Sequence, residues 1–113
     1  MPYIRTTTNV SVSDDAASRI REQLGDAIQL IPGKSERWLM LAMEGDKKMY
    51  FAGSDEPLAM AEVSLFGSAD GNCYNKLTGK ITEILSDVLS IPANRIYVRY
   101  SETEYWGWNG ENF

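Results

Sequence analysis

Apolar residues recur along the chain with two different periods, which divide its first half into a strand, a helix and a second strand. Residues 2–8, PYIRTTT, are typical of a short β-strand, and residues 38–43, WLMLAM, form a continuous apolar run of strand length. Between them, residues 14–31 carry apolar side chains at the spacing of one helical face, and this helix is expected to end near Pro32 and Gly33. Ser13 is the expected N-cap.

The second half of the chain repeats this order. Residues 60–66, MAEVSLF, and 96–100, IYVRY, are predicted strands, and a helical apolar face lies between Asn72 and Ser90. The segment GSDEP at 53–57 favours a turn between the two units. We therefore predict one domain over residues 1–113, built from two pseudo-repeats of about 1–57 and 58–113.

Two β-α-β units predict an α+β fold, a two-layer α/β sandwich of a four-stranded sheet with two helices on one face. Two helices can cover only one face of such a sheet. Because the run at 38–43 is apolar on both faces, we expect a hydrophobic face to remain open in the monomer. This predicts an obligate oligomer.

Charge and hydropathy exclude several classes of partner. The 113 residues include 11 Lys and Arg against 16 Asp and Glu, a formal net charge of -5, which argues against nucleic acid and anionic membrane surfaces as partners. No apolar stretch approaches the length of a membrane span, and the N-terminus does not resemble a secretory signal. We expect a cytoplasmic protein.

The side-chain inventory excludes further chemistry. Without any histidine, Ser-His-Asp and Cys-His nucleophile systems and imidazole zinc sites are ruled out. The single Cys73 cannot form an internal disulfide or a thiolate cage, and the glycines do not form a phosphate-binding loop. We therefore expect no metal and no cofactor.

Pro2 is the strongest candidate for a catalytic group. Removal of Met1 would leave its nitrogen as a secondary α-amine. An α-amine has a pKa of about 7.7–8.0, and burial or nearby cations lower that pKa, so a sheltered Pro2 could act as a neutral base. A proline at position 2 is common by chance, so the interpretation depends on the rest of the chain.

Pro2 at the start of the first strand and five further segments carry a resemblance to a known family. These segments are Gly33-Lys34, GSDEP at 53–57, SLFG at 64–67, ANRIYV at 93–98 and GWNGENF at 107–113. In this order and spacing the whole chain resembles macrophage migration inhibitory factor and its relatives in the tautomerase superfamily. The resemblance implies the tautomerase fold, a homotrimer, and pockets at subunit interfaces.

The resemblance also implies an isomerase activity, the keto–enol tautomerisation of α-keto acids such as phenylpyruvate, with Pro2 as the catalytic base. Lys34 matches the family's active-site lysine, and we assign it to the carboxylate or enolate oxygen of the substrate. A solvated lysine near a helix C-terminus is the alternative. Tyr97 matches a pocket tyrosine that reaches the site from a neighbouring subunit, and a strand-core role is equally open. Phe66 matches an apolar contact of the ligand. Five more residues fall at aromatic or apolar positions around the cleft: Tyr3, Trp38, Trp106, Trp108 and Phe113.

Arg99 departs from the family, since the mammalian cytokine has an uncharged amide at the matching position. An arginine presents a planar fork suited to a carboxylate, so we hypothesise that Arg99 joins Lys34 in binding an anionic substrate group. The alternative is a surface ion pair with Glu102 or Glu104.

Two other functions stay open. One is a cytokine-like protein that binds a host receptor and has a vestigial pocket, with export independent of a signal peptide. The other is hydratase or dehalogenase chemistry on unsaturated acids, for which Glu102 or Glu104 would have to activate water. A thiol oxidoreductase activity is excluded, because residues 58–61 read LAMA where the mammalian cytokine has Cys-x-x-Cys.

Overall fold

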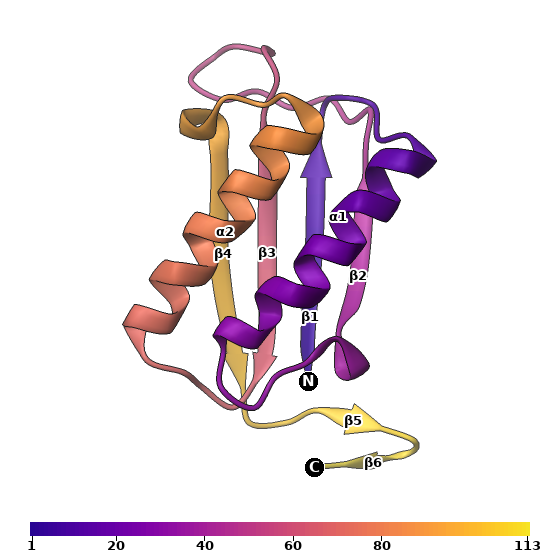
Figure 1. Ribbon diagram of the computed structural model, residues 1–113, viewed down its shortest axis with the longest axis vertical. Helices are drawn as coiled ribbons and strands as arrows, with labels where there is room; N and C mark the ends of the chain where they lie inside the picture. Colours follow the sequence, from indigo (N-terminus) through magenta and orange to yellow (C-terminus); the bar gives the residue numbers. More distant parts are fainter.

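The computed structural model describes all 113 residues as two layers, a mixed four-stranded sheet and two helices (Figure 1). The sheet has the order β2-β1-β3-β4, in which β1 is parallel to β2 and antiparallel to β3, and β3 is parallel to β4. Its strands are β1 (Pro2–Thr8), β2 (Met40–Glu44), β3 (Ala59–Phe66) and β4 (Ile96–Thr103). The predicted α+β fold class is confirmed.

Both helices begin at a capping side chain. In α1 (Asp14–Ala27), the Ser13 hydroxyl accepts from the Ala16 amide at 3.1 Å, and in α2 (Gly71–Leu89) the Asp70 carboxylate accepts from the Cys73 amide at 2.9 Å. The first helix is shorter than predicted. It ends at Ala27 and continues as a 3-10 turn, η1 (Ile28–Leu30), because Pro32 and the positive φ of Gly33 prevent further regular helix.

The core lies between the helices and one face of the sheet. Alternate residues of β1 and β3 point into it, so Ile4, Ala61, Val63 and Leu65 are buried while their neighbours along the strand are not. The helices contribute the same apolar positions that their spacing indicated: Ile20, Leu24, Ile28, Leu77, Ile81, Ile84 and Leu85.

Strand β2 begins later than predicted. Glu36–Trp38 form a 3-10 turn, η2, in which the Leu39 amide donates to the Glu36 carbonyl oxygen at 3.1 Å, and the strand starts only at Met40. Trp38 is therefore on a turn at the end of the sheet. The sequence alone does not distinguish the η2 turn from strand β2, because the apolar run extends from Trp38 at the end of the turn into the strand.

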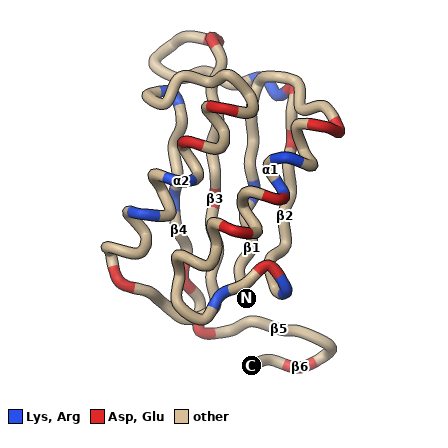
Figure 2. Tube along the Cα trace, in the orientation of Figure 1, with Lys and Arg blue, Asp and Glu red and all other residues tan.

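The expectation of a hydrophobic open face is wrong. Arg5, Glu62 and Arg99 lie in register across β1, β3 and β4 on the side away from the helices, and Arg5 pairs with Glu44 at 3.0 Å. Figure 2 marks basic and acidic positions along the chain, some of them on the strands of the sheet. Apolar and aromatic residues also lie on this face, namely Met40 and Ala42 of β2, Tyr3 of β1, Met60 and Phe66 of β3, and Tyr97 of β4. The open face is thus mixed in character, with a row of alternating charge.

The C-terminal tail forms a small hairpin that the sequence interpretation did not predict. Strands β5 (Gly107–Trp108) and β6 (Glu111–Asn112) are joined by Asn109 and Gly110, both at positive φ, as a two-residue turn of the tight hairpin type requires. The Phe113 amide closes the hairpin by donating to the Trp106 carbonyl oxygen at 3.0 Å. In Figure 1 it projects beyond the end of the sheet, beside the N-terminus.

Neither α1 nor α2 combines the length and the apolar character that a membrane-spanning helix needs.

Candidate functional site

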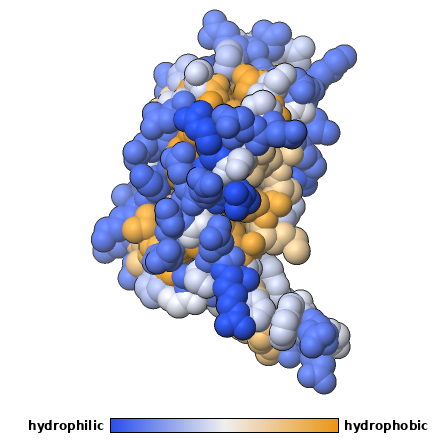
Figure 3. All heavy atoms as spheres, turned by 45° about the vertical axis from the view of Figure 1, so that its right-hand side comes forward, coloured by the Kyte–Doolittle hydropathy of each residue, from blue (hydrophilic) through white to orange (hydrophobic).

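A cleft of about 530 Å³ lies where the N-terminus, the η2 turn and the C-terminal hairpin meet. Its lining is largely apolar and includes Met1, Pro2, Arg37, Trp38, Leu39, Met40, Trp106, Gly107 and Trp108. Figure 3 shows the hairpin standing away from the body of the molecule, with a notch between the two. A largely apolar concave site with a few polar groups is the usual form of a small-molecule pocket.

The chain terminus is held at the floor of this cleft by the sheet. Pro2 is buried and pairs with Leu65 across β1 and β3, and the Phe66 amide donates to the Met1 carbonyl oxygen at 3.1 Å. These contacts fix the first peptide of the chain against the end of β3. The nitrogen of Pro2 therefore has a defined position at the cleft.

Lys34 lies beside the terminus. Gly33, at φ 80°, turns the chain after α1, and the Lys34 Nζ donates to the Phe66 carbonyl oxygen at 2.9 Å. Burial, followed by the charge of Lys34 and its hydrogen bond, lowers the pKa of the Met1 α-amine to about 6. An α-amine in this environment is therefore largely neutral at pH 7.

Aromatic side chains from distant parts of the chain form the cleft walls. Trp38 and Trp108 meet edge to face, with ring centroids 5.0 Å apart, and Trp108 stacks on Phe113 at 6.2 Å. Phe113 in turn contacts Phe66 at 5.7 Å. The hairpin thus brings the tail aromatics to the same end of the sheet as Pro2 and Lys34.

Tyr3 and Trp106 complete this end of the molecule. Trp106 is half-buried and lines the cleft. Tyr3 follows Pro2 on β1, is half-buried, and lies on the sheet face that the helices leave open. Eight of the ten predicted site residues therefore cluster around the terminus within a single chain: Pro2, Tyr3, Lys34, Phe66, Trp38, Trp106, Trp108 and Phe113.

Tyr97 and Arg99 do not join this cluster in their own chain. Tyr97 pairs with Met60, which pairs with Thr7, so it lies level with the far end of β1 and packs on Phe51 at 4.8 Å. That is about 17 Å along the strand from Pro2, at about 3.3 Å per residue. Both residues are exposed on β4, with 60% of Tyr97 accessible.

The two glutamates considered for water activation lie elsewhere. Glu102 accepts a hydrogen bond from the Tyr74 hydroxyl, and Glu102 and Glu104 border a separate polar hollow with Gly67 and Ser68. Neither lines the cleft at Pro2. Neither forms an ion pair with Arg99, whose guanidinium has no carboxylate within pairing distance.

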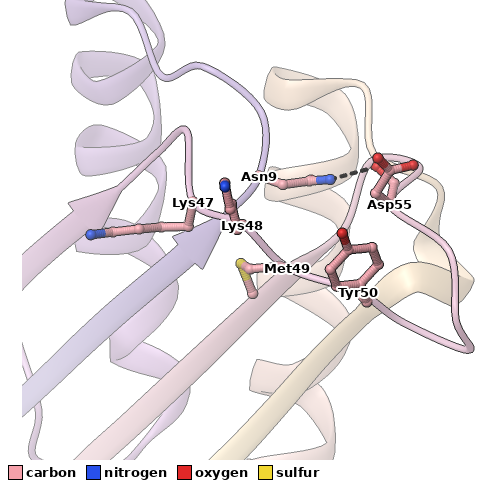
Figure 4. A pocket seen from close by; sticks show the side chains of 6 residues that line it. All are labelled: Asn9, Lys47, Lys48, Met49, Tyr50 and Asp55. Atoms are coloured by element: carbon pink, nitrogen blue, oxygen red, sulfur yellow. Dashed lines mark hydrogen bonds between the residues drawn. The ribbon is translucent and has the colours of Figure 1, made fainter.

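A second cavity, of about 360 Å³, lies at the other end of β1 (Figure 4). Lys47, Lys48, Met49 and Tyr50 line it, together with Asn9 and Asp55. The Asn9 amide is already committed, donating to the Asp55 carbonyl oxygen at 2.7 Å and accepting from the Leu58 amide at 2.9 Å. Its lining includes neither the chain terminus nor Lys34, so we take the cleft at Pro2 as the candidate active site.

Five lining residues were not among the predicted site residues: Met1, Gly107, Arg37, Leu39 and Met40. The signal that could have found Arg37 is its position directly before Trp38, since a cation next to an aromatic residue often packs on its ring. Leu39 and Met40 carried no separate signal within the apolar run.

The fold and cleft define a class of two-layer α+β proteins with a site at the N-terminal residue. Residues 1–113 match the Macrophage migration inhibitory factor (MIF) family. The chain is 32% identical to macrophage migration inhibitory factor of Xenopus laevis and 31% identical to that of Mus musculus, covering 100% of this chain and 99% of the relative in each case. It therefore belongs to the macrophage migration inhibitory factor family.

Solved structures agree with this assignment. The chain is similar to Leishmania major MIF2, with a TM-score of 0.94 and 32% identity over 100% of this chain and 97% of the other. It is also similar to the macrophage migration inhibitory factor homologue of Prochlorococcus marinus, with a TM-score of 0.89 and 30% identity over 98% of each chain.

Proposed function

We propose that this protein is a tautomerase that interconverts the keto and enol forms of α-keto acids of the phenylpyruvate type, with Pro2 as general base once Met1 is removed. The observation that carries the proposal is the position of the chain terminus, where Pro2 is buried at the end of the sheet with Lys34 beside it. The same surroundings lower the pKa of the Met1 α-amine to about 6, and we infer a lowered pKa for the Pro2 amine as well. A base of this kind is neutral at physiological pH and still able to accept a proton.

The reaction needs one proton carrier and one site for developing negative charge. The neutral Pro2 nitrogen removes a proton from the carbon next to the carbonyl, and the electron pair moves to the carbonyl oxygen to form an enolate. Return of the proton to that oxygen completes the enol, and the reverse sequence regenerates the keto acid. No atoms are gained or lost.

Lys34 is the proposed site that stabilises the developing negative charge of the enolate. Its hydrogen bond to the Phe66 carbonyl holds the ammonium group beside the terminus, with further N–H donors for the substrate. An ammonium group held in place in this way stabilises an enolate or carboxylate oxygen. The aromatic walls then bind the ring of the substrate.

The proposal includes a homotrimer in which Tyr97 and Arg99 reach the cleft of a neighbouring subunit. Their distance from Pro2 in their own chain, their exposure and the absence of an ion-pair partner for Arg99 support this arrangement. Arg99 would then add a second donor fork for the substrate carboxylate.

The test is the rate of phenylpyruvate enol–keto exchange for the wild type and for Pro2→Gly. A fall of at least about a hundredfold in kcat/KM supports the assignment, in the range usual for loss of a general base. Undiminished exchange in the variant would rule out Pro2 as the base. Pro57→Gly, a change at the turn before β3, serves as the matched control.

A further inference from the structure

Arg37 is the one charged side chain in the lining of the cleft. It lies on the η2 turn, and its guanidinium carbon is 5.2 Å from the centroid of the Trp38 ring. That contact orients the guanidinium group but uses its face and leaves its N–H donors free. The group is therefore held at the cleft with its hydrogen-bonding capacity unspent.

No carboxylate of the protein neutralises this charge. The ion pairs of the chain are Arg5 with Glu44, Arg21 with Glu22, and Lys80 with Glu83. The neighbouring Glu36 is turned toward α1, where its carboxylate fills the space that a Cβ atom at Gly25 would need. Arg37 is an exposed cation without an ion-pair partner, next to the apolar side chains of the cleft, and its guanidinium group is available to an anionic partner from outside.

A second cation, Lys34, lies near the cleft without lining it. Lys34 contacts Phe66 beside the chain terminus, whereas Arg37 packs on the Trp38 ring, on the turn that leads into β2. Apart from Arg37 and the terminal residues Met1 and Pro2, the lining consists of aromatic and aliphatic residues and a glycine, without any Asp or Glu. An elongated ligand with an apolar body and an anion at each end fits this distribution.

We propose that Arg37 is a specificity-determining residue that binds a second anionic group, a carboxylate or phosphate, at the end of the substrate remote from the α-keto acid. The inference rests on the proposed function, since it takes Lys34 and Pro2 as the site of the keto acid. It assigns the preferred substrate to the dianionic α-keto acids with an aromatic or otherwise apolar body.

The experiment compares phenylpyruvate with its para-carboxylated derivative on the full chain. The readout is the ratio of kcat/KM for the dianion to kcat/KM for the monoanion. In Arg37→Gln this ratio is expected to fall about tenfold, through KM, because a charge-assisted hydrogen bond far from the reacting carbon acts on binding. Arg37→Lys is expected to restore part of the ratio, since it returns the charge without the planar fork.

Arg21→Gln is the matched control, because Arg21 is exposed on α1 and does not line the cleft. It is expected to leave the ratio at the wild-type value. A ratio that Arg37→Gln leaves within about twofold of wild type would overturn the inference, whatever the absolute rates.

Failure of the proposed function gives a different result. If neither compound is turned over, the dissociation constants of the dianion and the monoanion are compared instead. Both are measured from the fluorescence of the tryptophans in the cleft walls. A selective loss of dianion affinity in Arg37→Gln still supports the subsite, while equal affinities for the two compounds in the wild type overturn it.

Discussion

The Lys34 ammonium group donates to the carbonyl oxygen of Phe66 at 2.9 Å, and the amide of the same Phe66 donates to the carbonyl oxygen of Met1 at 3.1 Å. One residue at the end of β3 therefore contacts both the chain terminus and the cation beside it. After removal of Met1, the pairing of Pro2 with Leu65 in the sheet and the bond from Lys34 to Phe66 would still hold the proposed base and its electrostatic partner at the same end of β3.

Replacement of Lys34 tests this arrangement. Lys34→Met keeps the length of the side chain and removes its charge, so kcat/KM for phenylpyruvate is expected to fall about 10- to 100-fold, the range for a lost charge-assisted hydrogen bond. Lys34→Arg is expected to retain more activity than Lys34→Met. Equal activity of Lys34→Met and wild type in a steady-state assay would remove Lys34 from the mechanism.

The pH dependence follows from the direction of the amine shift. A general base must be neutral, so kcat/KM is expected to rise with pH through the pKa of the base and to level off above it. Burial and Lys34 lower the pKa of the Met1 α-amine, and the Pro2 amine exposed by removal of Met1 would have the same neighbours, so the rise should come below the ordinary value near 8. In Lys34→Met the midpoint should move upward, because the neighbouring charge and hydrogen bond are gone. A wild-type midpoint at 8 or above would contradict the account.

Mixing of inactive variants tests the contribution of a neighbouring subunit. Pro2→Gly lacks the base, and Tyr97→Ala lacks a residue that lies at the far end of the sheet in its own chain. If Pro2 and Tyr97 of one active site come from different subunits, a mixture of the two variants that is unfolded and refolded will form hybrid oligomers. Some of their sites will then contain both an intact Pro2 and an intact Tyr97. Activity above the sum of the separate variants is then expected.

The same mixture without unfolding is the control, and it should show no gain. Absence of a gain after refolding, with a trimeric mass demonstrated by light scattering, would mean that Tyr97 does not act in a neighbour's cleft.

Two buried threonines on β1 provide a paired prediction about stability. Thr8 donates through Oγ1 to the Leu58 carbonyl oxygen at 2.7 Å and accepts from the Val10 amide at 3.2 Å, whereas the Thr6 Oγ1 is buried without a partner. Thr8→Val leaves two groups unsatisfied and should lower the free energy of unfolding by about 1–3 kcal/mol. Thr6→Val removes an unsatisfied hydroxyl and should be neutral or stabilising.

Urea titrations at one protein concentration measure both changes, because an oligomer's apparent stability depends on concentration. A larger loss for Thr6→Val than for Thr8→Val would contradict the hydrogen-bond pattern of β1.

The order of strands and helices was predictable because local periodicity carried it. Ile20 and Leu24 on α1, and Leu77 and Ile81 on α2, face the core as their spacing indicated. The start of β2 was not predictable from the sequence. The residues before it, Trp38 and Leu39, are apolar like those of the strand, so the apolar run does not show where the 3-10 turn ends and the strand begins. The alternating charges of Arg5, Glu62 and Arg99 were each visible in the sequence, but their register across three strands is a tertiary property.

The candidate site was predicted in part. The resemblance pointed to Pro2 and Lys34, and the structure brings them together around Phe66. The hairpin could have been found from Asn109-Gly110, whose residues favour a tight turn. Arg37 was missed although it directly precedes Trp38, and its place at the cleft depends on the η2 turn, which the apolar run did not reveal.

The central claim is that the Pro2 nitrogen is a free, neutral amine in the working protein. The most direct measurement is a pH titration of the Pro2 nitrogen resonance by NMR on a sample whose intact mass has been determined. We expect a mass lower by one methionine and a titration midpoint below the ordinary value of about 8 for an α-amine. A retained Met1, or a nitrogen that does not titrate, would make Pro2 an amide and contradict the mechanism.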